Sequence, residues 1–260
     1  MGARLSKGVY KFSSCDGCQL ALLNLGEGLL ALAREVEIVH FAEAGPLDPE
    51  RPVDIALVEG SLSGPADFDR IRAIRSRSRW LLAVGACATS GGLQALRNLA
   101  DRRDWLQAVY PNAEHLAGLG DANPLSQAVS VDLELWGCPV TGRQVVAAVR
   151  DLRVGVLPRR ERETLCLECK REQRVCTLVS AGAPCLGPVT RAGCGALCPG
   201  FGRACYGCTG PAETLNAGSL GRRIAGLGLL PEDLARRFLL FHSSVPAFRE
   251  ATSDTQGRRR

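Results

Sequence analysis

The sequence lacks any apolar run long enough to cross a membrane as a helix. After its charged start, Met1–Lys7, it also lacks the apolar stretch and cleavage site of a secretory signal peptide. These two absences exclude membrane-spanning proteins and proteins exported by such a signal. We therefore expect a protein without a membrane span that works in the cytoplasm.

Aromatic side chains and lysines are scarce. Aromatic residues make up 5% of the chain, and only three of the 32 basic residues are lysines. The formal net charge is +5, but the arginines are scattered and form no basic stripe interleaved with aromatic rings. The charge balance therefore does not indicate a nucleic-acid-binding protein.

Histidine is also rare, and a dinucleotide fingerprint is missing. None of the three histidines stands at a spacing typical of metal ligands, so we expect packing or surface roles for His40, His115 and His242. No GxGxxG motif follows a strand candidate, which excludes a dinucleotide site of that type. Any nicotinamide cofactor must therefore bind to another chain.

Cysteine, in contrast, is abundant, with 12 residues in a chain of 260. Disulfides form in oxidising compartments, and nothing in the sequence directs export. In a reducing cytoplasm, many cysteines at short spacings indicate metal sites. Twelve thiols are enough for three complete four-cysteine sites.

The density of cysteines divides the chain into two parts. Four are spread over the first half, and eight crowd into Cys166–Cys208. A charged stretch beginning at Pro158 is typical of an exposed linker. We expect two domains, residues 1–157 and residues 158–260.

Strand and helix patterns alternate in the first domain, which predicts an α/β fold with a parallel sheet covered on both faces. The expected strands are Val9–Phe12, Val36–Phe41, Asp54–Val58, Trp80–Val84 and Val131–Leu135. The expected helices are Gln19–Arg34, Ala66–Arg77, Gly92–Leu99 and Gln144–Arg150.

The second domain begins with a segment of little periodicity, rich in Gly and Pro, which needs metal or covalent cross-links to be ordered. We expect a helix at Pro231–Leu240, where proline suits the first turn. The tail Ser253–Arg260 is predicted to be disordered or ordered only by a partner.

The first four cysteines share one position relative to the expected strands. Cys15 and Cys18 follow the first strand, Cys87 follows the fourth, and Cys138 follows the fifth. Ligands of open parallel sheets bind outside the carboxyl ends of the strands, so these loops should bring four thiols to one edge. The alternative is a thioredoxin-like redox pair at Cys15 and Cys18, with Cys87 and Cys138 as buried small side chains.

The other eight cysteines have two metal interpretations. Two four-cysteine zinc sites would favour paired CxxC motifs, but only the outer two pairs have that spacing. The irregular inner spacings favour iron–sulfur clusters, which are wider than a single zinc ion. Because ligands can cross between neighbouring clusters, spacing alone leaves the grouping open. The eight are Cys166, Cys169, Cys176, Cys185, Cys194, Cys198, Cys205 and Cys208.

Several motifs resemble one known family over roughly residues 8–210. They are SSCDGC (13–18), VEGS (58–61), GACATSGG (85–92), GCP (137–139) and PCLGPVTRAGCGALCP followed by CYGC (184–208). In this order they resemble the small subunit of [NiFe] hydrogenases, which is related to the 20-kDa subunit of respiratory complex I. The resemblance implies a flavodoxin-like N-terminal domain, followed by an irregular, cysteine-rich, ferredoxin-like iron–sulfur domain.

The resemblance also implies three [4Fe–4S] clusters and their ligands. The proximal cluster would be held by Cys15, Cys18, Cys87 and Cys138. The distal cluster would be held by Cys166, Cys169, Cys176 and Cys185, with Cys166 where many uptake-type members have histidine. The medial cluster would be held by Cys194, Cys198, Cys205 and Cys208.

Cys198 sets this chain apart from members whose medial segment has three cysteines and a [3Fe–4S] cluster. A fourth thiolate implies a [4Fe–4S] medial cluster of lower potential. The VEG motif includes Glu59, whose role near the proximal cluster or in loop packing stays open.

By resemblance, the function is electron transfer within a soluble [NiFe] hydrogenase. Electrons would pass between the nickel–iron site of a large subunit and a flavin- or NAD(P)-binding subunit, or further iron–sulfur subunits.

The chain lacks the long twin-arginine leader of membrane-bound members and has the ferredoxin-like half. It looks most like the delta subunit of cytoplasmic sulfhydrogenases or the equivalent subunit of F420- or heterodisulfide-reductase-linked enzymes. It carries no nickel-binding motif, so it would not be catalytic for H2 alone. Two alternatives are a zinc-stabilised interaction module and a complex-I-like quinone-linked subunit.

Overall fold

The computed structural model describes residues 4–112, 120–158 and 161–256. The chain divides into two compact units, Met1–Pro158 and Arg159–Arg260. Each unit contains its own hydrophobic core. In the described part of the chain, no helix has both the length and the apolar character needed to cross a membrane.

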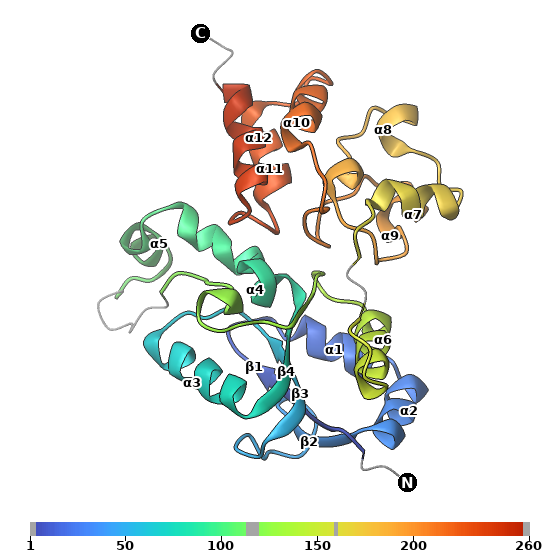
Figure 1. The fold of residues 1–260 in the computed structure, drawn as a ribbon. Coiled ribbons are helices and arrows are strands. Elements are labelled where there is room, and N and C mark those ends of the chain that lie inside the picture. Colours follow the sequence, from blue (N-terminus) through green and yellow to red (C-terminus); the bar gives the residue numbers. More distant parts are fainter. Residues whose placement is uncertain (1–3, 113–119, 159–160, 257–260) are drawn as a thin grey trace. The chain divides into compact units, whose positions relative to one another are not determined.

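The first unit contains a five-stranded parallel sheet with the strand order β2-β1-β3-β4-β5 (Figure 1). Its strands are β1 Ser6–Lys11, β2 Glu37–Phe41, β3 Val53–Glu59, β4 Ser78–Val84 and β5 Leu133–Leu135. This order is that of flavodoxin-like folds. The predicted α/β fold with a parallel sheet is therefore confirmed.

Helices cover both faces of this sheet. Successive strand residues point to opposite faces, so Val9 packs with one core and Tyr10 with the other. The Val9 face is covered by α1 Gly17–Leu23, α2 Glu27–Glu35 and α6 Gly142–Arg153. The Tyr10 face is covered by α3 Pro65–Ser76 and by Ala88 of α4 Gly85–Ser90.

The structure corrects the first expected helix. Gln19–Arg34 is not one helix, because α1 ends at Leu23 and α2 begins at Glu27. Gly26 lies between them with φ of 55°, a left-handed conformation that glycine adopts without a steric penalty. The expected helix Gly92–Leu99 forms as a 3-10 helix, η1, and α5 Arg102–Val109 follows it.

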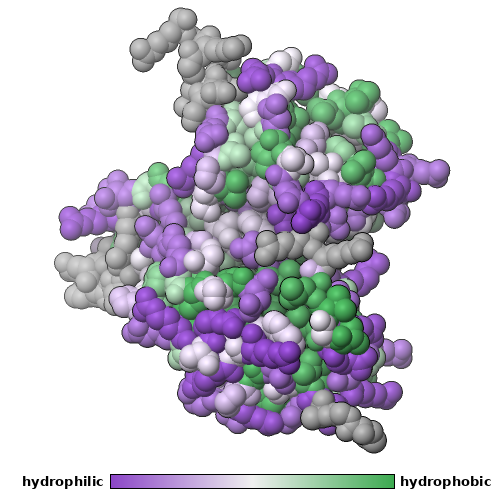
Figure 2. All heavy atoms as spheres, viewed as in Figure 1, coloured by the Kyte–Doolittle hydropathy of each residue, from purple (hydrophilic) through white to green (hydrophobic). Residues whose placement is uncertain are grey.

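The second unit begins with short elements around the cysteines. They are α7 Leu165–Arg171, α8 Thr177–Ser180, the 3-10 helix η4 Gly187–Val189 and α9 Leu197–Gly200. Apolar side chains gather at the surface over α8 (Figure 2), where Val179 is 81% exposed. Little apolar surface is buried here compared with the sheet of the first unit.

Three longer helices complete the second unit: α10 Ala217–Ala225, α11 Pro231–Leu239 and α12 Pro246–Gln256. The helix expected at Pro231–Leu240 is α11. The prediction of a disordered tail is wrong for residues 253–256, which belong to α12. Phe248 and Ala251 of α12 are fully buried in the core of this unit, and this packing holds the helix. Residues 257–260 lie outside the described residues.

Candidate metal centres

The first cysteine group lies at the carboxyl edge of the sheet. Cys15 lies in the connection from β1 to α1, and Cys18 lies in the first turn of α1. Cys87 lies in α4, which directly follows β4, and Cys138 follows β5. The backbone N–H of Ala86 donates to the carbonyl of Gly137 at 2.7 Å, which ties the loops of Cys87 and Cys138 together. Three segments far apart in the sequence therefore meet at one edge, as the strand pattern predicted.

The thiols of this group lie close to one another, with Cys18 buried, Cys87 and Cys138 partly buried and Cys15 exposed. Burial raises the pKa of the Cys87 thiol to about 12, and neighbouring Cys138 and Cys15 raise it further. Burial also raises the pKa of the Cys18 thiol. The nearby negative charge of Glu59 raises this pKa further, and Cys87 and Cys138 add smaller contributions. Binding to a metal centre deprotonates such thiols outright, because the cation offsets the cost of a buried negative charge.

Two glycines leave space beside the sulfurs of this group. A Cβ atom on Gly85 would lie 2.3 Å from Cys18 Sγ, and one on Gly92 would lie 2.9 Å from Cys87 Sγ. Both glycines have positive φ, at 85° and 58°. Any larger residue would fill the space next to these thiols, so the residues present fit a bulky iron–sulfur group.

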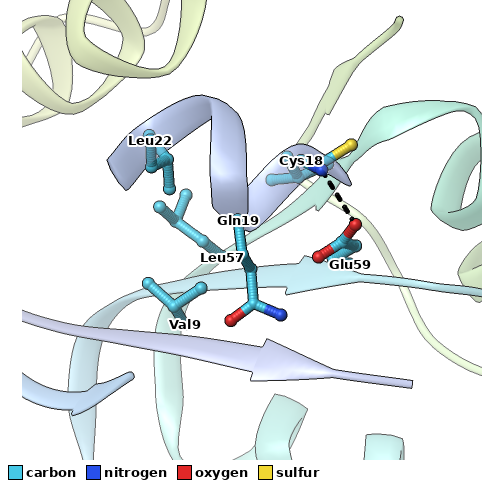
Figure 3. Close-up of a pocket in the computed structure, with 7 residues that line it drawn as sticks. Val9, Cys18, Gln19, Leu22, Leu57 and Glu59 are labelled. Atoms are coloured by element: carbon cyan, nitrogen blue, oxygen red, sulfur yellow. Dashed lines mark hydrogen bonds between the residues drawn. The ribbon is translucent and has the colours of Figure 1, made fainter. Parts of the chain in front are cut away.

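Glu59, at the end of β3, binds the backbone of this group. Its Oε1 accepts a hydrogen bond from the N–H of Cys18 at 3.0 Å (Figure 3). Burial raises the pKa of this carboxyl, and the Cys18 N–H partly opposes the effect. Glu59 therefore contacts the site directly, a role that the sequence left open.

A small cavity adjoins Glu59. It has a volume of about 10 Å³, room for about one water molecule, and Val9, Leu22 and Leu57 form much of its wall (Figure 3). In the described part of the chain, Glu59 Oε2 and both polar atoms of the Gln19 side chain have no hydrogen-bond partner. Gln19 was not identified from the sequence, because a glutamine in an apolar helix pattern carries no site signature.

The second cysteine group gathers around α7. Cys166 and Cys169 lie in α7, and Cys176 stands directly before α8. Burial raises the pKa of Cys169 to about 11, and Cys166, Cys185 and Cys176 add to the rise. A Cβ atom on Gly187 would lie 3.4 Å from Cys185 Sγ and 3.5 Å from Cys166 Sγ. The structure therefore brings these four cysteines together.

The remaining four cysteines form two neighbouring pairs. Burial raises the pKa of the Cys194 thiol, and the nearby Cys198 adds to this rise. Burial likewise raises the pKa of the Cys205 thiol, and the nearby Cys208 adds to that rise. The N–H of Gly207 donates to Cys205 Sγ at 3.3 Å. The structure therefore places Cys194 near Cys198 and Cys205 near Cys208.

The second and third cysteine sets touch each other. The N–H of Cys205 donates to Cys185 Sγ at 3.2 Å, and Cys194 contributes to the raised pKa of Cys169. Neighbouring sites of this kind are common in two-cluster ferredoxins. Across residues 4–112, 120–158 and 161–256, no three His, Cys, Asp or Glu side chains are arranged to hold a single metal ion.

The described histidines make packing or backbone contacts. His40 is buried and its ring lies 4.8 Å from that of Tyr10. The Nε2 of His242 lies 3.2 Å from the carbonyl oxygen of Cys208, and burial lowers its pKa to about 4. His115 lies outside the described residues.

Comparisons with known proteins agree on one family. Residues 15–152 match the family model described as NADH ubiquinone oxidoreductase, 20 Kd subunit. The chain is 35% identical to sulfhydrogenase 2 subunit delta of Pyrococcus furiosus, over 90% of this chain and 98% of that protein. It is 31% identical to a subunit of the vhu F420-non-reducing hydrogenase of Methanocaldococcus jannaschii, over 79% of this chain and 82% of that protein.

The solved structures support the same relationship. A chain of an NAD+-reducing [NiFe]-hydrogenase in the H2-reduced state matches with a TM-score of 0.55 and 30% sequence identity. The match covers 60% of this chain and 95% of the hydrogenase chain.

Proposed function

We propose that this chain, which belongs to the family of [NiFe] hydrogenase small and delta subunits and complex I 20-kDa subunits, is the electron-transfer subunit of a soluble [NiFe] hydrogenase. The chain is thus a subunit of an oxidoreductase. The observation that carries the proposal is the convergence of four thiols from three separate loops at one edge of the parallel sheet. That edge is where proteins of this architecture bind their ligands.

Three [4Fe–4S] clusters are proposed, in two domains, 1–157 and 158–260. The proximal cluster is assigned to Cys15, Cys18, Cys87 and Cys138. The medial cluster is assigned to Cys194, Cys198, Cys205 and Cys208, and the distal cluster to Cys166, Cys169, Cys176 and Cys185. Iron–sulfur clusters of this type supply one-electron carriers at potentials set by charge, hydrogen bonds and exposure.

The chain's own groups hold and tune these centres. The mutual nearness of Cys166, Cys169, Cys176 and Cys185 supports one shared site. Backbone N–H groups donate to two of the sulfurs, those of Cys185 and Cys205. Such hydrogen bonds stabilise negative charge on sulfur and raise a cluster's potential.

The proposed partners are a large subunit with the nickel–iron site and a subunit that reduces NAD(P) or another low-potential acceptor, with further iron–sulfur subunits. The names of the matched sulfhydrogenase delta subunit and of the NAD+-reducing hydrogenase structure support this assignment. We place the complex in the cytoplasm. No H2 chemistry is assigned to this chain's own residues.

The test is metal analysis of the chain purified anaerobically with its partners. We expect about twelve irons and about twelve sulfides per chain, with brown absorption that dithionite bleaches, as three cubane clusters require. Two zinc ions and no colour would overturn the proposal and favour a zinc-stabilised interaction module.

A further inference from the structure

Glu168 links the second and third cysteine sets. It lies on α7 between Cys166 and Cys169, and its carboxylate reaches the segment that carries Cys194. Oε1 accepts a hydrogen bond from the N–H of Gly195 at 2.9 Å, and Oε2 accepts one from the N–H of Ala196 at 3.2 Å. The N–H of Gly193 points to both oxygens, at 3.4 Å and 3.2 Å.

The backbone around Cys194 is shaped to receive this carboxylate. Gly193, Gly195 and Ala196 all have positive φ, at 118°, 72° and 49°. This turn directs the N–H groups of Gly193, Gly195 and Ala196 toward the Glu168 carboxylate, and N–H groups that converge in a turn form a concave site for an anion. Ala196 is fully buried, so removing the carboxylate would leave its N–H without this acceptor and would favour opening of the segment to water.

A second set of contacts ties the same two segments together closer to the start of α7. Thr164 and Arg191 form an antiparallel bridge, and the N–H of Ala192 donates to the carbonyl of Glu163 at 3.0 Å. The backbone bridge holds the base of the Cys194 segment, and Glu168 holds its tip. Removing the Glu168 side chain should therefore release the tip while the base stays in place.

We infer that Glu168 is a positioning residue that holds the Cys194 segment against α7 and thereby fixes the medial ligands relative to the distal ligands. This inference rests on the proposed function for its electron-transfer consequence. The carboxylate also places a negative charge between the two sites. A negative charge beside a cluster disfavours its reduction, so Glu168 lowers the reduction potential of the medial site.

The test compares three variants of the full chain in its complex. Glu168→Ala removes every acceptor, and Glu168→Gln keeps the size of the side chain but removes its charge. Glu172→Gln is the matched control, because Glu172 lies at the end of the same helix and pairs only weakly with Arg174 at 3.8 Å. Amide hydrogen exchange, iron content and redox titration followed by EPR are measured anaerobically.

In Glu168→Ala we expect exchange about tenfold faster at the amides of Gly195 and Ala196, because both lose their hydrogen-bond acceptor. Exchange at Leu165 and Ala192, in the backbone bridge, should not change. In Glu168→Gln we expect full iron content and a medial potential shifted upward. Glu172→Gln should match the unsubstituted protein in all three measurements.

Unchanged exchange at Gly195 and Ala196 in Glu168→Ala would overturn the positioning role. An unchanged medial potential in Glu168→Gln, with iron retained, would overturn the electrostatic role. Iron content is measured on the same samples, so faster exchange at full iron content tests Glu168 separately from the loss of a cluster. If the unsubstituted complex itself contains no iron–sulfur clusters, the proposed function fails, whatever the exchange data show.

Discussion

The carboxylate of Glu59 accepts a hydrogen bond from the backbone N–H of Cys18 at 3.0 Å, and both residues are buried. The strand β3 thus binds the first turn of α1 at the position where the first cysteine group forms. Removing the acceptor would leave a buried N–H without a partner, which typically costs about 1–3 kcal/mol.

We therefore predict that Glu59→Ala lowers the free energy of unfolding by about 1–3 kcal/mol. Glu59→Gln should lose much less, because the amide oxygen can still accept from Cys18. Urea unfolding of the full chain followed by circular dichroism measures both. Glu37→Ala is the control, because Glu37 on β2 is half-exposed and its carboxylate pairs with the exposed side chain of Arg51. Equal stability of the Ala and Gln variants would contradict the role assigned to Glu59.

Gly85→Ala should prevent the first cysteine group from holding its cluster. The added Cβ would lie 2.3 Å from Cys18 Sγ, a distance that forces the thiol or the backbone to move. Gly26→Ala is the matched control. Gly26 also has positive φ, but a Cβ there meets nothing within 4 Å, so this variant isolates backbone strain from the loss of space.

We expect Gly85→Ala to lose about four of about twelve irons, the content of one cubane cluster, while Gly26→Ala keeps them all. Both variants place alanine at positive φ and should therefore pay a backbone penalty, typically about 1–3 kcal/mol. Iron analysis of the anaerobic proteins distinguishes them. Full iron content in Gly85→Ala would show that this space is not needed for the cluster.

The sheet and its cysteine edge could be predicted because their signals are local. Runs of Val, Ile and Leu mark β3 and β4, and Cys87 follows β4 directly in the sequence. The parallel arrangement then requires that loops after different strands meet. The break at Gly26 was missed because the surrounding leucines and alanines favour helix, and a single glycine does not reveal its φ.

Other features depend on distant residues and have no local signal. The helix α12 is ordered because Phe248 and Ala251 pack in one core with α10 and α11, contacts that the sequence of the tail itself does not reveal. In the sequence, Glu168 cannot be distinguished from any other charged residue on a short helix. Its partners are the backbone N–H groups of Gly193, Gly195 and Ala196, which leave no side-chain signature. Such contacts can be recognised only when the fold is known.

Lys7 should destabilise the protein at neutral pH. It lies in β1 and is fully buried, next to Ile55 in β3, and its Nζ has no hydrogen-bond partner within the described residues. Burial lowers the pKa of its ammonium group from 10.5 to about 8. The folded state therefore binds fewer protons than the unfolded state between about pH 8 and pH 10.5, so stability rises with pH across that window.

We predict that Lys7→Met raises the free energy of unfolding at pH 7 by about 3 kcal/mol, the amount that corresponds to this pKa shift. The variant should also lose the increase in stability above pH 8. Lys11→Met is the control on the same strand, because Lys11 is partly exposed and pairs with Asp16 and Glu43. Urea unfolding from pH 7 to pH 10 tests both, and a Lys7→Met variant with unchanged stability would contradict the burial argument.

Cys198 should decide the type of the medial cluster. It lies on α9 close enough to Cys194 to raise the pKa of that thiol, so the two are placed as neighbouring ligands. Cys198→Ser removes one thiolate and should convert the medial cluster toward three irons, with about eleven irons per chain instead of about twelve. Losing a negatively charged ligand should also raise the cluster's potential.

The measurement is EPR of the oxidised complex, in which a [3Fe–4S] cluster is paramagnetic and a [4Fe–4S] cluster of the low-potential type is not. Leu197→Ala is the control, since this neighbouring side chain is 60% exposed and carries no thiol. A new oxidised [3Fe–4S] signal confined to Cys198→Ser would identify Cys198 as the fourth medial ligand. A silent oxidised spectrum with full iron content in Cys198→Ser would have to be repeated in Cys198→Ala, because a serine oxygen can replace the thiolate as an iron ligand. The same result in Cys198→Ala would remove Cys198 from the ligand set, since alanine cannot bind iron.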